Sequence, residues 1–239
     1  MGLVHRVVSL VPSLTEAVAV TVPGALVGAT NWCSHPADLD VVRVGGTKNP
    51  DVARIGALRP DLVVANAEEN RAVDLEALRA QGLSVLVTDP ETVPAALDQL
   101  RDLLALLGVR EAGWLTDAGR AWSRAWTGAR RRAVVPIWRR PWMALGRDTF
   151  AGDVLGRLGV DNVLAGDADR YPRIAIDTLP DHDLVVLPDE PYAFASGDGP
   201  EAFAAPSILV SGRHLTWYGP SLAEARDVLA AQLDTALPP

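Results

Sequence analysis

Apolar residues in this chain recur in short continuous runs that are bounded by turn residues. One run, Leu62–Ala65, follows the turn Pro60-Asp61 and precedes a polar loop with two adjacent acids, Glu68 and Glu69. A similar segment lies in the second half, where Pro180-Asp181 precedes the apolar run 184–187 and the acids Asp189 and Glu190. Runs of this kind are typical of strands buried on both faces of a parallel sheet. The repeat therefore predicts two similar α/β lobes.

The first half alternates strand and helix signals. We expect strands at 7–11, 25–29, 62–65 and 84–88, and helices from Pro12, over 52–58 and over 74–81. Ser13 is the predicted N-cap of the first helix, with Glu16 as its capping-box partner, and Asp51 is the predicted cap of the second. A βαβα series implies a parallel sheet with right-handed crossovers.

The middle of the chain, residues 92–132, has no strand signal. Apolar residues follow helical spacing over 93–107 and again over about 111–131. Trp114, Trp122 and Trp126 share that spacing, which predicts that they lie in the core. The basic run Arg130–Arg132 is expected to be the solvated end of the second helix, where positive charge complements the helix dipole.

The second half returns to an α/β pattern. Strands are expected at 133–138, 143–145, 184–187 and 207–210, and helices at 153–158, 174–179 and, capped by Ser221, 222–233. The predicted fold is therefore α/β, with two Rossmann-like lobes at 1–90 and 133–239 joined by a long helical backbone at 91–132.

Composition narrows the possible partners. The net charge of −8 argues against a nucleic-acid partner. No run of about 18 apolar residues suggests a membrane span, and the start of the chain lacks the pattern of a secretory signal. Cys33 is the single cysteine, which excludes an intrachain disulfide and fits a reducing compartment. We therefore expect a cytoplasmic protein.

Candidate ligand-binding residues gather in loops that follow the predicted strands, because ligands bind at the carboxyl ends of parallel strands. Large flat rings suit the faces of a corrinoid, porphyrin or other chelate, and polar groups suit its rim. These residues are expected to line a cleft between the lobes: Trp32, Cys33, His35, Glu68, Glu69, Asn70, Arg71, Trp138, Trp142, Arg147, Asp148, Asp189, Glu190, Tyr192, Trp217 and Tyr218.

Two kinds of chemistry are considered at these positions. Cys33 or His35 could supply one axial contact to a metal already held by a macrocycle, whereas a bare-metal site would need further ligands from acids such as Glu68 or Asp189. The paired acids are expected to cap helices and to pair with Arg71, Arg139 or Arg147 rather than to catalyse hydrolysis. No G-x-S-x-G, P-loop or G-x-G-x-x-G motif is present.

Several motifs occur in an order that resembles a known superfamily. They are Val8-Ser9-Leu10-Val11-Pro12-Ser13-Leu14-Thr15-Glu16, Val27-Gly28-Ala29-Thr30, Val44-Gly45-Gly46, Ile55-Gly56-Ala57-Leu58-Arg59-Pro60-Asp61-Leu62-Val63, Gly146-Arg147-Asp148-Thr149 and Trp217-Tyr218-Gly219-Pro220. The set is similar to the helical-backbone metal receptors, the class III periplasmic binding proteins that serve ABC importers, and most similar to their cobalamin-binding branch.

The resemblance implies a non-enzymatic protein that binds cobalamin or another metal chelate as its ligand and requires no cofactor. Members that dock on importers carry one exposed glutamate on each lobe, and the matching positions here are Ala53 and Ala175. We therefore expect a binding protein that does not dock on an ABC importer. Two alternatives stay open: an enzyme or biosynthetic helper that uses the cleft for an organic substrate, and a direct transition-metal binder.

Overall fold

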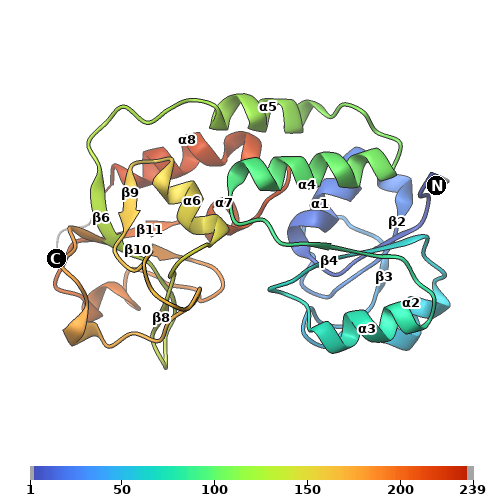
Figure 1. Ribbon diagram of the computed structural model, residues 1–239, viewed down its shortest axis with the longest axis horizontal. Coiled ribbons are helices and arrows are strands. Elements are labelled where there is room, and N and C mark those ends of the chain that lie inside the picture. The colour runs from blue at the N-terminus through green and yellow to red at the C-terminus, as the bar shows by residue number, and fades with distance from the viewer. Residues whose placement is uncertain (1–2, 236–239) are drawn as a thin grey trace. The chain divides into compact units, whose positions relative to one another are not determined.

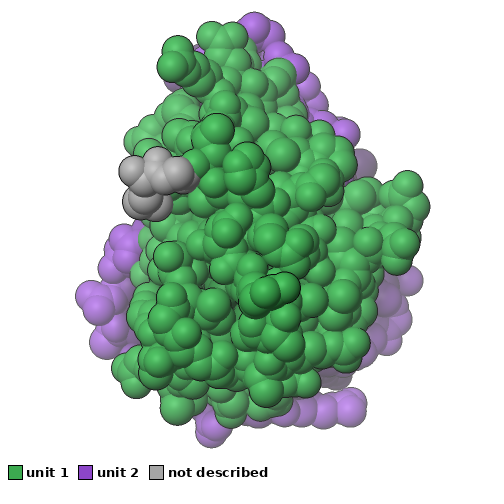
Figure 2. Space-filling view, turned by 90° about the vertical axis from the view of Figure 1, so that its right-hand side faces the viewer, with its two compact units in different colours: residues 1–89, 96–116, 218–220 green, residues 90–95, 117–217, 221–239 purple. Residues whose placement is uncertain are grey.

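The structure, a computed structural model, describes residues 3–235 and divides into two compact units. Unit 1 comprises Met1–Asp89, Ala96–Thr116 and Tyr218–Pro220, and unit 2 comprises Pro90–Ala95, Asp117–Trp217 and Ser221–Pro239, as coloured in Figure 2. The chain thus returns to unit 1 for three residues near its end.

Unit 1 contains a five-stranded parallel sheet in the order β3-β2-β1-β4-β5. Its strands are β1 (Val7–Ser9), β2 (Leu26–Ala29), β3 (Val42–Arg43), β4 (Leu62–Asn66) and β5 (Val85–Thr88). The helices are α1 (Pro12–Thr21), η1 (Pro23–Ala25), α2 (Val52–Ala57), α3 (Ala72–Ala80) and α4 (Val93–Leu106), which enters unit 1 at Ala96. Helices α1 and α4 cover one face of the sheet, and α2 and α3 cover the other (Figure 1).

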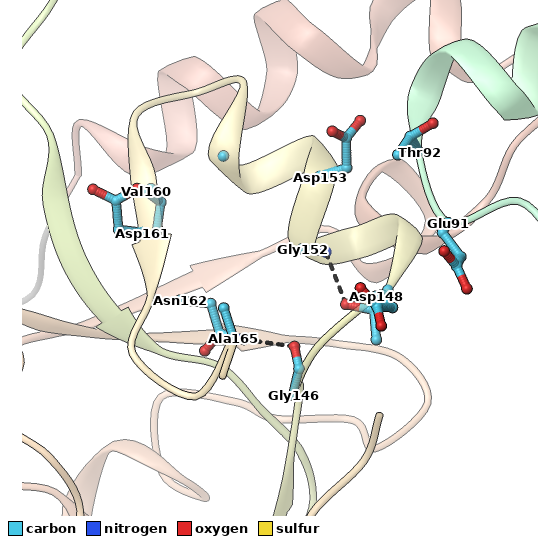
Figure 3. A pocket seen from close by; sticks show the side chains of 12 residues that line it. Glu91, Thr92, Gly146, Asp148, Gly152, Asp153, Val160, Asp161, Asn162 and Ala165 are labelled. Atoms are coloured by element: carbon cyan, nitrogen blue, oxygen red, sulfur yellow. Dashed lines mark hydrogen bonds between the residues drawn. The ribbon is translucent and has the colours of Figure 1, made fainter. Parts of the chain in front are cut away.

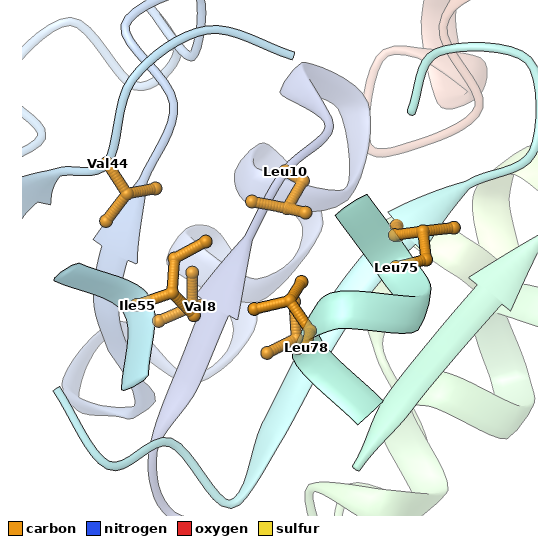
Figure 4. Packing of buried hydrophobic residues seen from close by; sticks show 8 residues of the cluster. Val8, Leu10, Val44, Ile55, Leu75 and Leu78 are labelled. Carbon is orange, nitrogen blue, oxygen red and sulfur yellow. The ribbon is translucent and has the colours of Figure 1, made fainter. Parts of the chain in front are cut away.

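The core of unit 1 on the α2–α3 side is built from apolar residues of the sheet and of both helices. Val8 and Val63 of the two central strands pack with Ile55 of α2 and with Leu75 and Leu78 of α3 (Figure 4). All five are at most 5% exposed. Fully burying side chains of this size stabilises the fold by about 1.5–3 kcal/mol each, so this layer holds the strand ends in place.

Unit 2 contains a four-stranded parallel sheet in the order β11-β10-β6-β9 and a short antiparallel hairpin of β7 and β8. The strands are β6 (Arg131–Val134), β7 (Pro136–Trp138), β8 (Met143–Ala144), β9 (Val160–Asn162), β10 (Leu184–Pro188) and β11 (Ser207–Val210). The helices are α5 (Gly113–Trp122), which begins in unit 1, α6 (Phe150–Gly156), η2 (Ile176–Thr178), η3 (Pro200–Ala202), α7 (Gly212–Thr216) and α8 (Leu222–Leu233). The prediction of an α/β fold with parallel sheets is confirmed.

The repeated segments occupy matching places in the two sheets. Strands β4 and β10 are both central and buried along their whole length. In both units an aspartate just before the strand accepts a backbone N–H of the neighbouring strand segment: Asp61 accepts from His5 and Arg6, each at 2.9 Å, and Asp183 accepts from Arg132 at 2.7 Å. In both copies of the repeat, neighbouring parallel strands are therefore joined by the same kind of hydrogen bond, from a backbone N–H to an aspartate.

Several local predictions are wrong. The first helix has Val11 as its N-cap and Pro12 at its first position, so Ser13 lies inside the helix; proline suits that position because it lacks the N–H that would have no helical partner. Asp51 does cap α2, since its carboxylate accepts the N–H of Arg54 at 2.9 Å. Ser221 is the residue before α8 but makes no side-chain cap.

The predicted helix over 111–131 is also wrong, because α5 ends at Trp122. The indole of Trp126 instead lies over Gly159, where an added Cβ would be 2.2 Å from its Nε1 atom. Trp126 is 37% exposed, so its predicted core position is wrong too, whereas Trp122 is 3% exposed and Trp114 is half-buried. The basic run is not a helix end: Arg130 pairs with Asp161, and β6 begins at Arg131.

Candidate functional site

Each parallel sheet has one point at which the strand order reverses. This point lies between β1 and β4 in unit 1 and between β6 and β10 in unit 2. Ligands of open α/β sheets bind outside the carboxyl ends of the strands at such points. The loop 67–71 follows β4, and the loop 189–192 follows β10. The structure therefore brings these predicted residues to the two expected sheet edges.

A buried asparagine organises the loop after β4. The side-chain oxygen of Asn66 accepts the backbone N–H groups of Glu68 and Glu69 at 2.8 and 3.1 Å. Asn70 then closes the turn, because its Oδ1 accepts the N–H of Asn66 at 2.9 Å and its Nδ2 donates to the carbonyl of Thr47 at 3.0 Å. Asn70, a predicted ligand contact, is only 3% exposed and holds the loop from inside.

Tyr218 also differs from its predicted role. It belongs to unit 1, is 5% exposed, and its hydroxyl lies 2.8 Å from both Asn66 Nδ2 and Thr88 Oγ1. Burial raises the pKa of Tyr218 well above its usual value, so the hydroxyl stays protonated at neutral pH. Tyr218 is therefore placed beneath the loop after β4 rather than on its surface.

The loop after β2 contains three predicted residues that differ in exposure. Trp32 is 69% exposed, whereas Cys33 is fully buried, with its Sγ 3.0 Å from Thr15 Oγ1 and 3.2 Å from Thr30 Oγ1. Burial raises the pKa of the Cys33 thiol, which disfavours the thiolate that a metal would need. His35 is half-buried, and its Nδ1 lies 3.2 Å from Ser34 Oγ, so His35 is the better placed of the two predicted axial ligands.

The predicted arginine partners differ from those observed. Arg71 forms two hydrogen bonds with Asp74 of α3, at 2.7 and 3.0 Å. Arg139, whose side chain is 18% exposed, pairs with Asp198 and Glu201, and Arg147 lies 3.6 Å from Asp148. All three cations therefore have an acidic partner within their own unit.

The main aromatic cluster lies in unit 2. The ring of Trp142 stacks on Phe194 at 5.9 Å and meets Phe203 edge-on at 5.2 Å, and Tyr192 lies 4.6 Å from Phe194. The Arg139 guanidinium sits over the Trp142 ring at 5.1 Å. We call these five residues, together with Trp138, the aromatic cluster. Phe194 and Phe203 were not among the predicted residues, although both follow β10 in the sequence.

Trp138 is the exposed member of the aromatic cluster. Its side chain is 42% exposed, and its ring meets Tyr192 edge-on at 5.7 Å. The Tyr192 hydroxyl in turn donates to Asp198 at 2.6 Å, and this bond lowers the pKa of Asp198. An exposed indole held from the side by a fixed tyrosine offers a flat, preorganised surface to a ligand ring.

Asp189, Glu190 and Trp217 lie in two segments of unit 2, the loop after β10 and residues 212–217, which are hydrogen-bonded to each other. Asp189 Oδ1 accepts the N–H of Gly212 at 2.5 Å, and Glu190 Oε2 accepts the indole N–H of Trp217 at 3.0 Å. The guanidinium of Arg213 lies over the Trp217 ring at 5.6 Å. Gly212 permits this approach, since a Cβ there would be 2.5 Å from the Glu190 backbone nitrogen.

A pocket of about 320 Å³ lies beside α6 and β9 of unit 2 (Figure 3). Its lining includes the carboxylates of Asp148, Glu91, Asp153 and Asp161. Two of these carboxylates are used internally: Asp153 accepts from Arg157 and from the N–H of Val93, at 2.7 and 2.8 Å, and Asp161 pairs with Arg130. Across residues 3–235, no group of three His, Cys, Asp or Glu side chains could hold a metal ion.

The comparison with protein families decides the chain's affiliation. The model of the family described as periplasmic binding protein matches residues 7–183, which is more than half of the chain. The chain belongs to the periplasmic binding protein family. Within the described residues of this family member, no helix is long and apolar enough to cross a membrane.

Curated and solved relatives agree with this family. A vitamin B12-binding protein of Pectobacterium carotovorum subsp. carotovorum (strain PC1) is 25% identical over all of this chain and 91% of that relative. Among solved structures, the periplasmic vitamin B12 binding protein BtuF of Vibrio cholerae matches with a TM-score of 0.77 and 18% identity, over 97% of each chain. The periplasmic heme-binding protein BhuT, solved with two hemes, gives 0.75 and 23%, over 97% of this chain and 98% of that one. These structural matches confirm the class III fold.

Proposed function

We propose that this chain binds a metal chelate of the corrinoid or haem class and releases it unchanged, as a binding protein and not as an enzyme. The full-length similarity to a protein named for vitamin B12 supports this ligand class. The predicted cleft between two lobes stays a prediction.

The exposed ring of Trp138 is the observation that carries the proposal. A corrinoid or porphyrin is bound chiefly through its large flat apolar faces, and an aromatic side chain that already has a fixed orientation loses little freedom on binding. Trp138 meets these conditions because Tyr192 holds its edge while 42% of it stays exposed. Glu68 and Glu69, in the loop after β4, are suited to bind the polar rim of such a ligand.

Equilibrium binding of cyanocobalamin, haemin and a ferric siderophore tests the proposal. Each ligand is followed by its own visible absorbance during dialysis. We expect cyanocobalamin or haemin to bind at low micromolar concentration or better, and more tightly than the siderophore. Trp138→Leu should weaken that binding about twofold to tenfold, since an aromatic contact is worth about 0.5–1.5 kcal/mol beyond its buried area.

Trp126→Leu is the matched control, because Trp126 is similarly exposed, at 37%, but packs against glycines away from the strand-end loops. It should bind the ligand as the wild type does. Absence of binding by both cyanocobalamin and haemin at high micromolar concentration would refute the proposal. Equal affinity of Trp138→Leu and wild type would remove Trp138 from the site.

The proposal includes independence from an ABC importer. Ala53 on α2 and Ala175 before η2 are both exposed, and neither can form an ion pair with a transporter arginine. A pull-down with the wild-type protein as bait should recover no ABC importer of the native host. Transport that depends on this protein would contradict this part of the proposal.

We also propose a cytosolic location. Recovery of the protein in a periplasmic or extracellular fraction of the native host would contradict this location.

A further inference from the structure

The tripeptide Tyr218–Pro220 belongs to unit 1 but lies in the sequence between two segments of unit 2. Trp217 is the last residue of unit 2 before the crossing, and its indole is hydrogen-bonded to Glu190 of that unit. Tyr218, the next residue, is buried in unit 1. Gly219 lies against the α1 start, where an added Cβ would be 2.8 Å from the Ser13 carbonyl oxygen. Two consecutive side chains are thus anchored in different units.

The hydrogen bonds of Tyr218 have a defined direction. Asn66 Nδ2 can only donate, so the Tyr218 oxygen accepts from it at 2.8 Å. Thr88 uses its single hydroxyl proton on the carbonyl of Ala65 at 3.0 Å. The Tyr218 proton therefore goes to Thr88 Oγ1, at 2.8 Å. These directions pair the amide of Asn66 and the hydroxyls of Tyr218 and Thr88 in one continuous chain of hydrogen bonds.

The Asn66 amide links this buried chain to the loop above it. Its oxygen must face the N–H groups of Glu68 and Glu69, which it accepts at 2.8 and 3.1 Å, so its nitrogen must face Tyr218. A rotation of the amide would break both sets of bonds together. The orientation of the loop amides and the position of the tyrosine hydroxyl are therefore coupled.

We infer that Tyr218 is a positioning residue, whose hydroxyl fixes the Asn66 turn and thereby the presentation of Glu68 and Glu69. The segment through which the chain leaves unit 2 thus sets the conformation of a strand-end loop in unit 1. Only the effect on ligand affinity rests on the proposed function; the effect on the loop does not.

Amide hydrogen exchange in the ligand-free protein tests this coupling. Tyr218→Phe keeps the ring and removes the hydroxyl, and we expect exchange at the Glu68 and Glu69 amides to accelerate about tenfold, because one buried hydrogen bond is lost. Thr88→Val removes the acceptor of the same proton and should act on the same amides. The double variant should show less than the sum of the two effects.

Tyr192→Phe is the matched control, since it is the same substitution at a half-buried tyrosine of unit 2, whose hydroxyl donates to Asp198. It should leave the exchange of Glu68 and Glu69 unchanged. Unchanged exchange at both amides in Tyr218→Phe would overturn the inference. A uniform acceleration over all of unit 1 would also overturn it, because the hydroxyl would then stabilise the unit without positioning the loop.

A binding measurement separates this inference from the proposed function. With cyanocobalamin or haemin as the probe, Tyr218→Phe should bind about fivefold to tenfold more weakly than wild type. If the wild type binds and the variant binds equally well, Tyr218 does not position the site. If the wild type binds neither probe, the proposed function fails, and the exchange data alone decide the inference.

Discussion

Trp142→Leu should destabilise unit 2, because Trp142 is the centre of the aromatic cluster. Its ring stacks on Phe194 with an interplanar angle of 4° at 5.9 Å and meets Phe203 at 73° and 5.2 Å. Both arrangements are favourable, and each is worth about 0.5–1.5 kcal/mol beyond buried area. We expect a loss of about 1–3 kcal/mol in the free energy of unfolding, to which the lost contact with Arg139 adds in the same direction.

Urea denaturation followed by far-UV circular dichroism measures this loss. Trp126→Leu is the control, because its indole only donates to the nearby carbonyl of Ala129, at 3.0 Å, and packs on glycines. We expect the control to lose less than about 1 kcal/mol. A loss below about 0.5 kcal/mol in Trp142→Leu, or an equal loss in both variants, would refute the reasoning that the aromatic cluster holds this part of unit 2 together.

Three further predictions concern strain, reactivity and pH. Gly212→Ala should lower the melting temperature by several degrees, since its Cβ would be 2.5 Å from the Glu190 backbone nitrogen; an unchanged melting curve would contradict this close approach. Cys33 should react with a thiol reagent only on the timescale of unfolding, because it is fully buried and burial raises its pKa; fast labelling of the native protein would contradict its placement. Hydrogen bonds from the His5 backbone and from Arg130 lower the pKa values of Asp61 and Asp161, respectively. The two ionised carboxylates therefore stabilise the fold above about pH 4, and this stability is lost as the pH falls through the lowered pKa values. The unfolding free energy of Asp61→Asn should depend less on acid pH than that of the wild type, and identical pH profiles would contradict this role of Asp61.

Much of the fold follows from local sequence patterns. The apolar runs around Val63 and Val185 predicted the two central strands, because a strand buried on both faces needs no polar alternation. Asp51 predicted the start of α2 for an equally local reason, since its carboxylate caps a backbone N–H close to it in sequence.

The errors arose where distant residues decide the structure. Helical spacing placed Trp126 in a helix, but its contact with Gly159 holds it elsewhere. Cys33 lies in a polar loop, yet it is buried and accepts a hydrogen bond from the hydroxyl of Thr15 in α1. Tyr218 stands in a turn sequence and is buried by partners far away in the chain, Asn66 and Thr88. No local pattern contains these contacts.

Native mass spectrometry after incubation with excess cyanocobalamin or haemin tests the central claim most directly. The account predicts a 1:1 complex with at least one of the two chelates, and a lower fraction of complex for Trp138→Leu than for Trp126→Leu under the same conditions. The claim would be contradicted if the spectrum showed the unliganded chain alone at ligand concentrations well above those of the equilibrium binding experiment.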